Sequence, residues 1–120
     1  MIAIGAIAGA WARYGMSVLF IPLCKSLNLG TLFVNLLGSF IIGTLFSAVD
    51  THFTQSSAFR FLMITGFLGS FTTFSGFTIE TLQLLRQREV AMCTAHIILQ
   101  VGGGILATFA GYFLIKRLAY

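Results

Sequence analysis

The sequence predicts an all-α membrane protein with four transmembrane helices, and two observations support this prediction. Of the 120 residues, 58% are hydrophobic and only 8% are charged, and the mean hydropathy of +0.97 lies above the range of soluble domains. In addition, three polar breaks divide the chain into four apolar runs, each long enough for the ~20 residues that cross a bilayer core. The predicted helices cover residues 2–23, 30–49, 58–85 and 90–115, in a single domain over residues 1–120.

Composition also excludes several classes of function. The formal net charge of +4 comes from 7 basic and 3 acidic residues, and no basic stripe is present, so we expect no nucleic-acid partner. Cys24 and Cys93 are far apart and form no CxxC or Cys/His pattern, which gives no support to a disulfide framework or a cysteine metal site. The first apolar run has Arg13 at its centre and no basic segment before it, so we expect it to be mature structure rather than a signal peptide.

The charges that flank the helices predict no preferred orientation in the membrane. With four crossings, each side receives three basic residues: Arg60, Lys116 and Arg117 on one, and Lys25, Arg86 and Arg88 on the other. The positive-inside rule is then balanced, and two oppositely oriented copies can pair as an antiparallel dimer. Loop boundaries shifted by a residue or two, or the charge of the N-terminal amine, would instead fix one orientation.

The third apolar run contains an interruption at residues 66–80, GFLGSFTTFSGFTIE, which has three glycines and five hydroxyl residues. A helix in lipid must satisfy its own backbone, so such a stretch is tolerated only where protein or a water-filled cavity surrounds it. The run is also longer than one straight crossing requires. We therefore predict a broken helix and an ion or substrate site at the break. Carbonyls freed within residues 69–73 would suit an alkali cation.

Two phenylalanines follow this break. Phe74 and Phe77 have i,i+3 spacing and share one helix face. The edge of a phenyl ring is electropositive, so a small anion can approach it. The alternative is that both rings simply face lipid.

Polar residues recur every four positions on the second and fourth helices, so each helix has a narrow polar stripe. The stripes consist of Asn35, Ser39, Gly43 and Ser47, and of His96, Gln100, Gly104, Thr108 and Tyr112. Asn35 offers two N–H donors to an anion, although it can equally form an interhelical hydrogen bond that holds the bundle.

Arg13 is costly in the middle of a membrane helix and must face a partner or a wet cavity. It either attracts anions to a pore mouth, caps the carbonyls of a broken helix, or extends to the interface.

These stretches resemble the small four-helix fluoride channels of the Fluc/CrcB family. The resemblance rests on GTLFVNLLGSFIIG at 30–43, GFLGSFTTFSGFTIE at 66–80 and the lead-in Gly-Ala-Trp-Ala-Arg-Tyr at 9–14, and it covers essentially the whole chain. It implies a passive channel, not an enzyme, in the cell inner (plasma) membrane that exports cytoplasmic fluoride. It further implies a dual-topology homodimer with two antiparallel pores, and a structural sodium ion held by main-chain carbonyls at the dimer interface.

The resemblance also implies roles for individual residues. It assigns the fluoride pathway to Asn35, Phe74, Phe77, Ser75, Gln100, Thr108 and the vestibule residue Arg13, and the sodium site to the carbonyls of Gly69 and Thr72. The sequence departs from the usual pattern at three positions. Gly76 and Gly104 stand where a hydroxyl residue is common, and Ser70 replaces the second glycine of a Gly-Gly pair. Some relatives pair two divergent chains, so a divergent partner chain stays an alternative to the homodimer.

Two other classes of function compete with the channel. A proton-coupled exporter of the small multidrug-resistance type needs a titratable carboxylate in mid-membrane. Asp50, Glu80 and Glu89 are all expected at or near helix ends, which disfavours this class. A structural or regulatory membrane protein without transport would leave the broken helix, the stripes and Arg13 unexplained.

Overall fold

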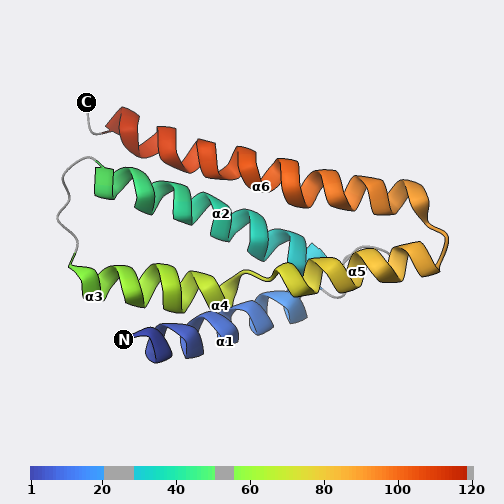
Figure 1. The fold of residues 1–120 in the computed structure, drawn as a ribbon, viewed down its shortest axis with the longest axis horizontal. Coiled ribbons are helices and arrows are strands. Elements are labelled where there is room, and N and C mark those ends of the chain that lie inside the picture. Colours follow the sequence, from blue (N-terminus) through green and yellow to red (C-terminus); the bar gives the residue numbers. More distant parts are fainter. Residues whose placement is uncertain (21–28, 51–55, 119–120) are drawn as a thin grey trace.

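The residues that the structure describes form four long helices, of which the third is interrupted (Figure 1). The computed structural model describes residues 1–20, 29–50 and 56–118, and the helices in these ranges are α1 (Ile2–Phe20), α2 (Leu29–Asp50), α3 (Ser57–Arg60), the π-helical segment η2 (Phe61–Leu68), α4 (Gly69–Phe71), α5 (Phe74–Arg86) and α6 (Val90–Leu118). Several predicted features lie outside the described residues: the end of the first helix at residue 23, the polar break at 22–28 with Cys24 and Lys25, and residues 51–55 of the polar break at 50–57.

Each of the four helices is long and apolar enough to cross a membrane. The candidate spans are Ile2–Phe20, Leu29–Ala48, Ser57–Arg86 and Val90–Leu118. The third span joins α3, η2, α4 and α5 end to end, with the interruption between α4 and α5. The predicted all-α membrane fold with a broken third helix is therefore confirmed.

The helices pack mainly as two pairs. In Figure 1, α6 lies alongside α2, and α1 lies alongside the first half of the third span. At the α2/α6 contact, a Cβ added to Gly43 would lie 2.1 Å from the carbonyl oxygen of Thr108, and one added to Gly111 would lie 2.1 Å from that of Phe40. Backbone therefore packs directly on backbone, which only glycine permits at these two positions.

The second pair is packed as closely as the first. A Cβ on Gly5 would lie 2.2 Å from the carbonyl oxygen of Leu62, and one on Gly9 would lie 2.2 Å from that of Phe67. The i,i+4 spacing of these glycines matches the small-residue pattern of close membrane-helix contacts. The segment that they contact, η2, is a π-helix rather than an α-helix, a difference that the hydrophobic pattern did not predict.

The interruption of the third span consists of Thr72 and Thr73, within the residues predicted to break. Thr72 is extended, with φ −81° and ψ 158°, and Thr73 is extended as well, with φ −147° and ψ 114°. The helix restarts at Phe74 because Thr73 acts as its N-cap, and the Thr73 Oγ1 accepts a hydrogen bond from the Gly76 backbone N–H at 2.9 Å.

Candidate functional site

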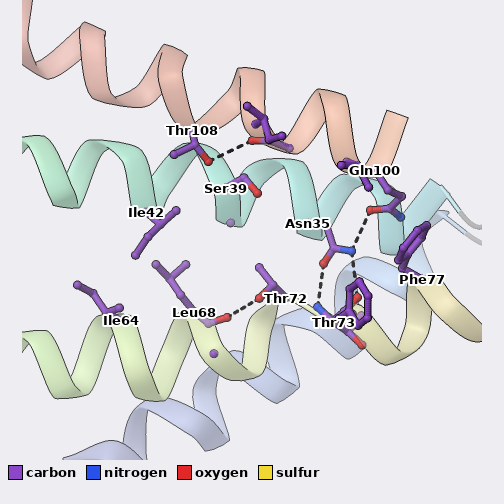
Figure 2. Close-up of a pocket in the computed structure, with 16 residues that line it drawn as sticks. Asn35, Ser39, Ile42, Ile64, Leu68, Thr72, Thr73, Phe77, Gln100 and Thr108 are labelled. Atoms are coloured by element: carbon purple, nitrogen blue, oxygen red, sulfur yellow. Dashed lines mark hydrogen bonds between the residues drawn. The ribbon is translucent and has the colours of Figure 1, made fainter. Parts of the chain in front are cut away.

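A pocket of about 560 Å³ lies beside this interruption, between the third span, α2 and α6 (Figure 2). Most of the residues predicted to form the site line the pocket: Asn35, Gly69, Thr72, Phe74, Phe77, Gln100 and Thr108. Arg13 and Ser75 do not line it. The helix break thus brings the two polar stripes and the phenylalanine pair to one place.

Asn35 joins α2 to the break through both groups of its amide. Its Nδ2 donates to the Thr73 carbonyl oxygen at 3.1 Å, and its Oδ1 accepts from the Thr73 backbone N–H at 2.8 Å. Asn35 Nδ2 also donates to Gln100 Oε1 on α6, at 2.9 Å. The interhelical role left open for Asn35 is therefore present, and it links all three walls of the pocket (Figure 2).

The bond from Thr73 to Asn35 changes the backbone one turn earlier. In a continuous α-helix the N–H of Thr73 would donate to the carbonyl of Gly69, but here it donates to Asn35 Oδ1. Gly69 therefore loses the donor that helix geometry would supply, and the residue is exposed in the single chain. A carbonyl oxygen that lacks its helical donor is a hard oxygen ligand for a cation.

Phe74 and Phe77 form a pair at the start of α5. Their ring centroids are 5.5 Å apart with an interplanar angle of 57°. Phe77 is only 9% exposed, whereas Phe74 is 76% exposed in the single chain. Both residues line the pocket, and the edge of a phenyl ring carries positive quadrupole charge.

Arg13 approaches the break from α1. Its Nη1 lies 3.5 Å from the carbonyl oxygen of Thr72. Of the roles considered for Arg13, this geometry corresponds to capping a carbonyl of the broken helix.

These features can be compared with known proteins. The family described as "CrcB-like protein, Camphor Resistance (CrcB)" matches residues 1–112 of the chain. The chain belongs to this family. With its four apolar helices, this CrcB-like chain is a multi-pass membrane protein.

Three curated relatives, each named fluoride-specific ion channel FluC, are similar over nearly the whole chain. The Cupriavidus taiwanensis protein is 40% identical, covering 98% of this chain and 94% of its own length. The Pseudomonas putida protein is 37% identical, covering 97% and 94%, and the Ralstonia nicotianae protein is 35% identical, covering 98% and 93%. The resemblance predicted from the motifs is confirmed.

The hydroxyl residues of the CrcB-like site bond mainly within their own helices. Thr108 Oγ1 donates to the Gly104 carbonyl at 3.1 Å, and the Ser75 hydroxyl is exposed and lies 3.2 Å from Thr73 Oγ1. The N-cap of α5, Thr73, explains why position 76 is a glycine and not a hydroxyl residue. A Cβ at position 76 would lie 2.8 Å from Thr73 Cγ2.

One cluster in this CrcB-like chain was not predicted from the sequence. Thr31 Oγ1 donates to Glu80 Oε1, and Glu80 Oε2 lies 3.5 Å from His96 Nε2. The side chain of Glu80 is 12% exposed and that of His96 only 1%. Glu80, expected at or near a helix end, instead lies within α5 (Phe74–Arg86), where its side chain is largely enclosed. The only sequence signal was the place of His96 in the polar stripe of its helix.

The Phe77 ring connects this cluster to the pocket. Its centroid lies 5.3 Å from that of the His96 ring, while Phe77 itself lines the pocket. The polar stripe of α6 therefore continues from the pocket toward Glu80.

Proposed function

We propose that this chain is a fluoride-selective passive channel that exports cytoplasmic fluoride and confers fluoride resistance. The observation that carries the proposal is that its relatives, at 35–40% identity over nearly the whole chain, are named fluoride-specific ion channels. The pocket adds a physical reason. Fluoride is small and strongly hydrated, so it crosses only where donors and ring edges replace its water. A passive pore needs no enzymatic step, since the membrane potential supplies about 2.3 kcal/mol per charge for each 100 mV.

The proposed channel is an antiparallel dimer of this chain in the cell inner (plasma) membrane. Gly69 and Phe74 line the pocket and are exposed in the single chain, so this part of the pocket wall lies at the surface of one copy. Backbone polar groups at such an interruption need protein or water around them in a bilayer, and a second copy would supply that cover. A divergent partner chain is the alternative, and the mass of the purified oligomer distinguishes the two.

A structural sodium ion at the dimer interface completes the proposal. Its ligands would be the carbonyls of Gly69 and Thr72, two from each subunit. Gly69 fits this role because its helical donor is diverted to Asn35. Thr72 fits this role in part. Its backbone is extended, and Arg13 approaches one side of its carbonyl oxygen. The second lone pair of that oxygen is left for an ion. When bound, the ion would neutralise carbonyl dipoles that face one another across the interface.

The direct test is fluoride release from proteoliposomes measured with a fluoride electrode, with potassium and valinomycin setting the potential and no pH gradient. We expect release well above that of protein-free liposomes. Chloride-loaded vesicles serve as the matched control and are expected to show no release above background. Equal release of both anions, or none of fluoride, would contradict the proposal.

Sodium removal gives a second expected result. Replacing sodium on both membrane faces by N-methyl-D-glucamine should slow fluoride release, because facing carbonyls would lose the cation that holds them together. Restoring sodium should restore the rate, whereas magnesium, which prefers a hydrated octahedral site, should not. An unchanged rate in sodium-free solution would remove the sodium site from the proposal.

A proton-coupled exporter is the second candidate, because Glu80 is a carboxylate within the third span whose side chain is only 12% exposed. Such an exporter would respond to a pH gradient at zero potential. The channel would respond to the potential alone. Repeating the release assay under each gradient separately therefore distinguishes the two functions.

A further inference from the structure

We propose that the C-terminal end of α6 binds an anionic phospholipid. Lys116 and Arg117 hold the phosphate, and an acyl chain lies along the apolar face that leads from these two residues into the bilayer. The inference concerns a surface away from the pocket at the helix break, and it does not depend on the proposed transport of fluoride.

A groove of about 710 Å³ lies at this end of α6. The described residues that line it are three apolar ones, Ala110, Phe113 and Leu114, and two basic ones, Lys116 and Arg117. None of these described residues is acidic, and none of them lines the pocket beside the helix break. The groove is therefore a separate surface, which combines cations with apolar side chains.

The groove lies on a flank of α6 that the described elements leave uncovered. Its lining residues other than Lys116 have the i,i+3,i+4,i+7 spacing of one helix face. Gly111, between them in sequence, instead meets the Phe40 carbonyl oxygen of α2. Among the described elements α6 packs only against α2 and α5, and Figure 1 shows it at the edge of the molecule. Phe113 and Leu114 are accordingly 53% and 46% exposed.

The length of this face matches one leaflet of a bilayer. The apolar face continues for one more turn to Leu106, which is 71% exposed. From Leu106 to Arg117 the helix rises about 16 Å, at ~1.5 Å per residue, and half of a hydrocarbon core measures about 15 Å. When Lys116 and Arg117 lie at the level of the headgroups, Leu106 lies near the middle of the bilayer. A lipid has its charge and its apolar chain at the same spacing.

Aromatic rings beside the basic residues indicate the same depth. The ammonium of Lys116 lies 5.7 Å from the centroid of the Tyr112 ring, and the Tyr112 and Phe113 rings meet edge to face with centroids 5.4 Å apart. Tyrosine is enriched where a helix passes from hydrocarbon to headgroups. The stem of Lys116 can pack on this ring while its charge stays in the polar layer, which is where a lipid phosphate lies.

Charge favours a lipid over a second copy of the chain as the occupant. In an antiparallel copy, the opposite end of the helices lies at the same membrane level, and there Arg86 and Arg88 outweigh Glu89. Like charges would then face Lys116 and Arg117, which disfavours this contact. An anionic phospholipid brings a complementary charge instead. A zwitterionic lipid brings its own cation with its phosphate, so it gains less from the two basic residues.

Native mass spectrometry of the purified protein tests the site, with palmitoyl-oleoyl phosphatidylglycerol as the anionic lipid and palmitoyl-oleoyl phosphatidylcholine as the neutral one. We expect the wild type to retain phosphatidylglycerol at lower lipid concentrations than phosphatidylcholine. Combining Lys116→Gln with Arg117→Gln should weaken retention of phosphatidylglycerol about thirtyfold, or about fivefold for each basic residue at a membrane surface. Retention of phosphatidylcholine should change little.

The matched control combines Arg86→Gln with Arg88→Gln, which removes the same charge at the opposite end of α6. This variant should retain phosphatidylglycerol as the wild type does. Equal losses in the two double variants would mean that the lipid responds only to net charge, and would overturn the site. Undiminished retention after the Lys116 and Arg117 substitutions would overturn it as well.

The apolar half of the site is tested by Ala110→Trp, which fills the groove and keeps both basic residues. We expect weaker retention of phosphatidylglycerol, because the acyl chain loses its place on α6. Unchanged retention would contradict binding of the chain along this face. Thermal unfolding in detergent establishes that each variant is folded. Since lipid retention is measured without fluoride, its outcome and that of the release assay are separate.

Discussion

Replacing Phe74 by isoleucine is expected to reduce fluoride release to the rate of protein-free liposomes while the protein still folds and pairs. Phe74 is 76% exposed in the single chain, so its ring contributes little to the chain's own packing. Isoleucine keeps an apolar side chain but has no electropositive ring edge for an anion. The measurement is electrode-detected release, with oligomer mass determined on the same preparation.

The matched control for this substitution is Phe113→Ile. Phe113 lies on α6 and is 53% exposed, but it does not line the pocket. We expect wild-type release from this variant. If Phe74→Ile also releases fluoride at the wild-type rate, the ring is a packing or lipid-facing group, as the sequence allowed.

The substitution Gly43→Ala is expected to destabilise the fold strongly. The added Cβ would lie 2.1 Å from the Thr108 carbonyl oxygen. This oxygen belongs to the backbone of α6, so it cannot move aside as the end of a flexible side chain can. Overpacking of this kind typically costs about 1–3 kcal/mol, and here it would force α2 and α6 apart. Thermal unfolding of the purified protein in detergent should show a lower midpoint.

Gly102→Ala provides the control for that measurement. A Cβ at Gly102 has nothing within 4 Å, so the substitution adds only the helix preference of alanine, worth about 0.5–1 kcal/mol. Its midpoint should equal or exceed that of the wild type. A midpoint for Gly43→Ala as high as that of Gly102→Ala would mean that α2 and α6 are not in backbone contact there.

The fold was predictable because its determinants are local in sequence. Apolar run length sets the number of crossings, and the hydroxyl and glycine content of residues 66–80 marks where the third helix breaks. The broken third helix was predicted, and the observed break at Thr72 and Thr73 falls inside the expected stretch. By contrast, nothing in the period of the apolar residues distinguishes the π-helical geometry of η2 from an α-helix.

The sequence predicted which residues form the site, but not which hydrogen bonds they make. Helical spacing placed Asn35 and Gln100 on polar stripes, yet which partner each one meets depends on the rotation of α2 and α6 about their axes. The backbone of Thr73 supplied the decisive contacts, and backbone groups have no signature in a sequence pattern. Glu80 illustrates the same limit, because its partners Thr31 and His96 lie on two other helices.

The glycine contacts of the fold have a mechanical consequence. Gly43 and Gly111 bring the backbones of α2 and α6 into contact, and Gly5 and Gly9 do the same for α1 and the third span, so the helices of each pair are held closely together. The pocket lies at the seam between the two pairs, which the hydrogen bonds of Asn35 to Thr73 span. The width of the pocket therefore depends on how the two pairs lie against each other, and this position is held by the bonds of Asn35 to Thr73 together with the contacts of Thr31 and His96 with Glu80.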